Sequence, residues 1–172
     1  IATLVRSRHP VVAVETVEEE RARDVIAAVG AQLEMPVFEW SVTTGFRRLG
    51  DDIVNGMTTS PDALLAHIGG MTVEALYLVS DLHPHLTEPL VERHLRDVVT
   101  AFRETRATVV LVGADVTLPA AVDADTVRIR LALPDRRELE EVVRSVLRAA
   151  GAQPPPRGVD ALLDAVRGLT LN

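Results

Sequence analysis

The sequence of 172 residues contains no lysine, so each of its 18 basic residues is an arginine. A conventional Walker A motif, G-x-x-x-x-G-K-[ST], is therefore excluded, because its lysine neutralises the outer phosphates of a bound nucleotide. Cysteine is also absent, which excludes disulfides, zinc–thiolate sites and thiol nucleophiles. No apolar run approaches the roughly 20 residues that a membrane-spanning helix needs, and no signal-peptide pattern opens the chain. We expect no membrane partner and a cytoplasmic protein.

The overall charge argues against a nucleic-acid partner. The net charge is −7, whereas domains that bind a phosphate backbone show a basic stripe. Only 3% of the residues are aromatic, but 47% are hydrophobic, which is enough to fill a core. This length suits one domain, with room for part of a second.

Five short apolar runs predict buried parallel strands, and helical patterns separate most of them. The runs are Val11–Glu15, Val37–Trp40, Ala75–Ser80, Thr108–Val112 and Val127–Leu133. Capping boxes at Thr16/Glu19 and Asp135/Glu138 mark two of the helix starts. The alternation predicts an α/β fold with a doubly wound, five-stranded parallel sheet. Ligands of such sheets bind at the carboxyl ends of the strands.

The residues at that carboxyl edge do not form a phosphate site. After the first strand come three consecutive glutamates, residues 18–20, and no glycine, so the start of the next helix would repel a triphosphate. Asp81 takes the place of a metal-binding acid, but Leu82 follows it where hydrolases carry a second acid. Asp115 follows the fourth strand. We therefore predict no catalytic residue, no cofactor-binding residue and no bound cofactor for this chain.

The segment from Asp81 to His85 leaves one alternative open. Asp81, His83 and His85 offer carboxylate and imidazole ligands on one turn, with Glu88 nearby, which would suit a metal-dependent hydrolase or a nucleotide-binding domain. The simpler interpretation is a polar turn that leads into the next helix, shaped by Pro84.

The stretch from Ser41 to Gly50 is expected to be a loop that follows the second strand. An exposed Trp40 beside Arg47 and Arg48 would suit a protein interface, because tryptophan and arginine are enriched at interface hot spots. The alternative is that Trp40 packs at the end of its strand.

Four segments together resemble one family. They are Pro10–Arg21, Trp40–Gly45, Leu78–Leu86 and Leu133–Leu139, and the closing Gly168–Asn172 extends the likeness over nearly the whole chain. They look like the N-terminal module of AAA-type ATPases typified by a hypothetical chloroplast reading frame, also found in cyanobacteria and other bacteria. That module has an ATPase-like fold without a phosphate loop, and its resemblance implies the strand order 5-1-4-3-2.

The resemblance also implies a domain division, a longer parent protein and its partners. Residues 1–150 would form the degenerate α/β domain, and residues 151–172 a linker and the first helix of a helical lid. The chain would then be a fragment of a longer protein whose second module binds ATP and Mg²⁺. Its expected role is non-catalytic, regulatory or in assembly, with that ATPase module and copies of itself in a ring as partners. Because ATPase rings place arginines against a neighbour, Arg136 and Arg137 join Arg47 and Arg48 as interface candidates.

Overall fold

The computed structural model describes residues 1–51, 58–132, 136–149 and 151. The chain divides into two compact units, Ile1–Leu131 and Ala132–Asn172. The first unit contains a six-stranded sheet, and the described part of the second contains helix α6, Arg136–Ala149. The linker and lid helix that the sequence suggests for residues 151–172 lie almost entirely outside the described residues, so the division at residue 150 stays a prediction.

The sheet has the order β3-β2-β4-β5-β1-β6. Its strands are β1 (Val11–Glu15), β2 (Val37–Ser41), β3 (Gly45–Arg48), β4 (Leu76–Ser80), β5 (Thr108–Gly113) and β6 (Thr126–Arg130). Five of them are parallel neighbours, and numbered among themselves they follow the predicted order 5-1-4-3-2. The doubly wound α/β prediction is therefore confirmed, and the order differs from it by one additional strand.

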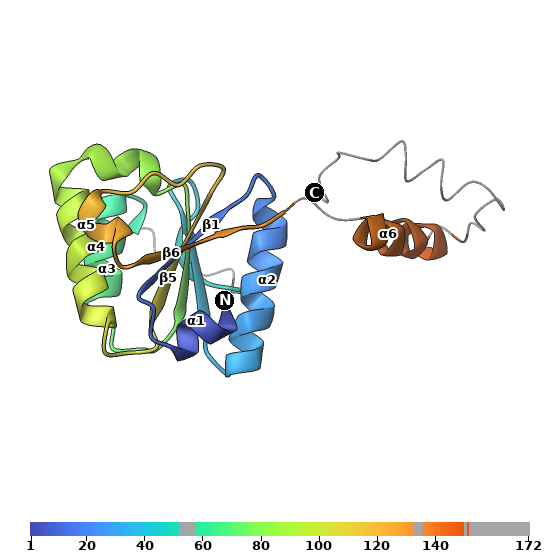
Figure 1. Cartoon of the computed structure of the whole chain (residues 1–172), viewed down its shortest axis with the longest axis horizontal. Helices are drawn as coiled ribbons and strands as arrows, with labels where there is room; N and C mark the ends of the chain where they lie inside the picture. Colours follow the sequence, from blue (N-terminus) through green and yellow to red (C-terminus); the bar gives the residue numbers. More distant parts are fainter. Residues whose placement is uncertain (52–57, 133–135, 150, 152–172) are drawn as a thin grey trace. The chain divides into compact units, whose positions relative to one another are not determined.

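Alternate residues of the central strands fill two separate cores. Leu76 and Leu78 of β4 join the core beneath α1 (Ala2–Arg6) and α2 (Glu19–Leu33). Tyr77 and Val79 join the core beneath α3 (Pro61–Gly69), α4 (Pro89–Phe102) and α5 (Ala120–Asp123). Figure 1 shows these two groups of helices on opposite faces of the sheet. Because both faces are covered, β4 reads as a continuous apolar run instead of an alternating one.

The prediction of a loop after the second strand is wrong. Residues 45–48 form β3, which pairs antiparallel with β2 and places Phe46 opposite Trp40. Gly45 makes the turn possible with a φ of 69°, in the left-handed region that glycine tolerates. Phe46 then stacks on Phe38 with 5.1 Å between ring centroids, which holds the hairpin against the sheet.

The start of α2 differs from the prediction. Helix α2 begins at Glu19, and the Thr16 hydroxyl accepts a hydrogen bond from the N–H of Glu18 instead of forming a capping box with Glu19. Helix α4 begins at Pro89, after a short 3₁₀ helix, η2, at His83–Thr87. Asp135, the first residue of the other predicted capping box, lies outside the described residues, so that box stays a prediction. In the described part of the chain, no helix combines the length and hydropathy needed to span a membrane.

Helix α2 ends at a strained residue. Glu34 closes the helix with φ 55° and ψ 37°, the left-handed conformation in which glycine is strongly preferred. Replacing Glu34 with glycine removes the steric cost of a Cβ in this conformation. We expect Glu34→Gly to raise the free energy of unfolding by about 0.5–1 kcal/mol, measured by urea denaturation. Glu34→Ala keeps the Cβ and is the control, so an equal gain from alanine would contradict this explanation.

Candidate functional site at the carboxyl edge of the sheet

The turn between β1 and α2 lies where a nucleotide-binding fold places its phosphate loop. The turn is short and is held against the neighbouring strand β5, because the N–H of Thr16 donates to the carbonyl of Gly113 at 2.8 Å. Glu18 is fully buried and pairs with Arg21 at 3.0 Å. Glu19 and Glu20 follow in the exposed first turn of α2. The prediction that glutamates occupy this helix N-terminus is confirmed, and their carboxylates already balance its positive dipole.

Glu15, the last residue of β1, is held by the edge strand β6. Its two carboxylate oxygens pair with Arg128 at 3.2 Å and with Arg130 at 3.3 Å. Its carbonyl accepts a hydrogen bond from the N–H of Leu131 at 3.1 Å. Arg128 also binds Asp123 at 2.6 Å, and this hydrogen bond, followed by that to Glu15, raises the pKa of its guanidinium. The charge that Glu15 brings to the carboxyl edge is therefore neutralised within the fold.

Asp81 lies just past β4, with its N–H donating to the carbonyl of Val112 at 3.0 Å. It is exposed and has a φ of 52°, so its backbone is strained. The ring of His83 packs on Gly113, where a Cβ would lie 2.8 Å from the imidazole Cε1. Glycine at position 113 is thus needed for β5 to lie this close to His83.

The proposed metal ligands do not converge. Within the described parts of the chain, no three histidine or acidic side chains are grouped so that they could hold a metal ion. His85 instead lies 3.9 Å from Glu88 on its own short helix, which agrees with the simpler interpretation of a polar turn. Asp115 is exposed beyond β5.

Trp40 is not the exposed interface residue that the sequence left possible. Its side chain is 2% exposed, and its indole N–H donates to the carbonyl of Thr58. Arg47 is also engaged within the fold, because its Nε donates to Glu39 at 2.7 Å. The alternative interpretation, in which Trp40 packs at the end of its strand, is the correct one.

The partner of Arg47 is a buried carboxylate shared by three elements. Glu39 of β2 receives Arg47 from β3 and Arg23 from α2, the latter at 2.6 Å. Burial by itself raises the pKa of the Glu39 carboxyl, but the hydrogen bonds and charges of the two arginines lower it below its ordinary value. The hydrogen bond between Arg23 and Glu39 also raises the pKa of the Arg23 guanidinium. This network fixes the β2–β3 hairpin to α2 and gives Arg47 a structural role, whereas the interface role suggested by the sequence stays a prediction.

A cavity of about 360 Å³ opens beside this network, between the start of α2 and the ends of β2 and β4. Its charged lining consists of Glu19, Glu20 and Glu39 against Arg23 and Arg47. The two arginines bind Glu39, so the three carboxylates of the lining outnumber its two guanidinium groups and leave it with a net negative charge. Such a lining repels phosphate.

The remaining interface candidates lie elsewhere. Arg48 is exposed at the other end of the hairpin, away from the carboxyl edge. Arg136 and Arg137 begin α6 and are exposed within the second unit. No signal in the sequence indicated the pairing of Glu15, because the alternation of Arg128 and Arg130 with apolar residues is typical of any edge strand.

Comparisons with known proteins identify one family. Residues 1–131, the whole first unit, match the family model described as SpoVK-like AAA ATPase, N-terminal domain. An AAA domain-containing protein, ycf46, of Guillardia theta is 28% identical over 98% of this chain and 34% of its own length. The chain thus spans about a third of the curated relatives that it matches.

Solved structures share the fold at low sequence identity. A chain of the HORMA:CdnC:Trip13 complex of E. coli MS115-1 superposes with a TM-score of 0.59 at 16% identity, covering 96% of this chain and 62% of its own. The AAA domain of FIGL-1 in complex with ADP gives 0.57 at 16% identity, covering 95% and 55%. These likenesses establish an AAA-type fold for the first unit.

Proposed function

The chain belongs to the family of SpoVK-like AAA ATPase N-terminal domains, and we propose that it is a regulatory and assembly domain that binds no nucleotide of its own. In this proposal the chain is not an enzyme, and it acts through contacts with the rest of its parent protein. The parent's activity belongs to a second module that binds ATP and Mg²⁺. The chain contributes a folded AAA-type unit whose carboxyl edge is occupied by its own side chains.

The observation that carries the proposal is the closed turn between β1 and α2. A phosphate loop leaves backbone N–H groups open at a helix N-terminus. Here the Thr16 N–H binds Gly113, and the Glu18 N–H binds the Thr16 hydroxyl. The Glu18 side chain adds no donor for phosphate, because it is a buried carboxylate paired with Arg21. A ligand would have to displace these contacts and also approach Glu19 and Glu20.

The expected partners follow from the same features. The ATPase module on the same polypeptide is the first partner, and further copies arranged in a homo-oligomeric ring are the second, as is general for ATPases that share arginines between subunits. The net charge of −7 disfavours nucleic acid. A cytoplasmic location remains part of this proposal.

Isothermal titration calorimetry with Mg-ATP tests the proposal. We expect no saturable heat up to millimolar nucleotide, because a net acidic edge without lysine repels the phosphates. ADP is titrated in parallel, because it carries less negative charge than ATP and an acidic edge would repel it less. Micromolar affinity for Mg-ATP, competed by ADP and lost in Asp81→Ala, would overturn the proposal, as would phosphate release from ATP that Asp81→Ala abolishes.

A further inference from the structure

A shallow groove lies at the amino end of the sheet, where α2 ends and β2 begins, away from the carboxyl edge. Its volume is about 460 Å³. Met35, Pro36, Phe38 and Val73 give it an apolar lining, and Val73 is 45% exposed. We propose that this amino-edge groove joins two copies of the chain in an isologous dimer, in which the same surface of each copy faces the other.

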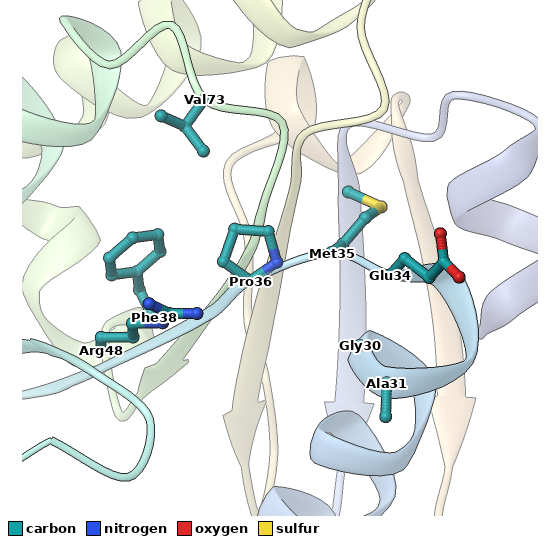
Figure 2. A pocket seen from close by; sticks show the side chains of 8 residues that line it. All are labelled: Gly30, Ala31, Glu34, Met35, Pro36, Phe38, Arg48 and Val73. Atoms are coloured by element: carbon teal, nitrogen blue, oxygen red, sulfur yellow. The ribbon is translucent and has the colours of Figure 1, made fainter.

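The two ends of the groove carry opposite charges. Figure 2 shows Arg48 beside Phe38 at one end and Glu34 at the other, with Pro36 and Met35 between them. Both charged residues are exposed. Within the described part of the chain, Arg48 and Glu34 form no ion pair. Arg47, by contrast, is paired with Glu39. The groove therefore offers one cation and one anion for a partner.

This arrangement is complementary to itself. A two-fold axis that lies in the plane of the interface and crosses the middle of the groove at right angles to its length brings Arg48 of one copy opposite Glu34 of the other, and does so twice. Paired charges at the ends fix the register, while the apolar lining between them loses water. Val73 beside the groove supplies an exposed apolar side chain that the partner's groove can cover. A second copy is thus the occupant that satisfies both ends at once.

The backbone of Glu34 is an independent observation. The left-handed conformation at φ 55° ends α2, and glutamate adopts it at a higher cost than glycine, so the choice of glutamate needs a reason of its own. Within the described residues, the Glu34 side chain forms no hydrogen bond or ion pair that supplies this reason. A carboxylate that pairs with Arg48 of a second copy does.

The dimer goes beyond the proposed function. It uses the amino end of the strands, whereas the proposed absence of nucleotide binding depends on the carboxyl edge. The two can fail separately, since calorimetry with Mg-ATP tests only the carboxyl edge and oligomeric state tests only the groove.

Analytical ultracentrifugation of the 172-residue chain over a wide range of concentration tests the dimer. We expect a monomer–dimer equilibrium. Arg48→Glu and Glu34→Arg should each weaken it by about tenfold or more, because each creates two like-charge contacts across the axis. Combining both substitutions in one chain exchanges the two ends and should restore dimerisation. Glu34→Arg keeps a side chain of similar length in the same backbone conformation, so loss of the fold is not the expected cause.

Mixing the two single variants gives the sharpest result. Arg48→Glu alone presents two anions and Glu34→Arg alone two cations, so each resists self-association, while their mixture should form a heterodimer. Arg96→Glu, an exposed substitution on α4 at a residue that does not line the groove, is the matched control and should leave the equilibrium unchanged. A wild-type chain that stays monomeric at millimolar concentration overturns the proposal and leaves the groove to another partner. A dimer that the charge exchange does not affect overturns it equally.

Discussion

Gly30→Ala is expected to lower the free energy of unfolding by about 2 kcal/mol, although alanine is the better helix former. Gly30 lies in the last turn of α2, where the helix packs against the start of β2. A Cβ at this position would lie 2.4 Å from Cγ2 of Val37 and 3.1 Å from the carbonyl oxygen of Met35. Val37 is buried and β-branched, so its rotamer cannot readily change, and the helix must move away from the sheet.

Urea denaturation of two matched variants separates the clash from helix propensity. Gly69→Ala places the same methyl group in α3, where the nearest atom is Cγ2 of Val98 at an ordinary 3.4 Å, and should be neutral or stabilising by up to about 1 kcal/mol. In the background of Val37→Ala, the cost of Gly30→Ala should largely disappear because the clashing methyl group is gone. If Gly30→Ala behaves like Gly69→Ala, the close approach of α2 to β2 is wrong.

The parallel core of this fold was predictable because its signals are local. Each buried strand, such as Leu76–Ser80, is covered on both faces and so appears as an uninterrupted apolar run. The glutamates at the start of α2 were predictable for the same reason, because the helix dipole favours acidic residues within the first turn. The strand order came from the family resemblance and not from these runs.

The hairpin β2–β3 was missed because its causes are not local. Gly45–Arg48 has neither the length nor the pattern of a typical strand, and it is held by the stack of Phe46 on Phe38 and by the bond from Arg47 to Glu39. A sequence shows that Trp40 and Arg47 are chemically suited to an interface. The sequence does not show whether the partners of these two side chains belong to the same fold or to another protein.

The carboxyl edge illustrates the same limit. The sequence indicated acidic residues there, but Glu15 meets Arg128 and Arg130 across more than a hundred residues of chain. Arg128 and Arg130 lie on the strand that neighbours β1, and their alternation marked them only as residues of an edge strand. Register between two strands decides such a pairing, and register depends on the whole sheet.

The stability of the domain is expected to fall by about 2–3 kcal/mol between pH 10 and pH 12, because of one buried phenol. Tyr77 of β4 is 1% exposed, lies among Phe38, Phe46 and Phe102, and donates to the carbonyl of Val73 at 3.0 Å. Burial disfavours the phenolate and raises the pKa of Tyr77 from 10.0 to about 12. Above pH 10 the unfolded chain releases this proton while the folded chain retains it, so rising pH favours unfolding.

The composition of the chain makes this effect unusually easy to assign. Tyr77 is the one tyrosine, and neither lysine nor cysteine is present to titrate in the same range. Urea denaturation at intervals from pH 9 to pH 12 gives the stability, and the ultraviolet absorbance of the phenolate in the native protein gives the pKa directly. Tyr77→Phe is the control. It should lose about 1 kcal/mol at neutral pH with the hydrogen bond to Val73 and then remain flat through the alkaline range. An equal alkaline loss in Tyr77→Phe, or a native phenolate that forms near pH 10, would show that the phenol is not buried as described.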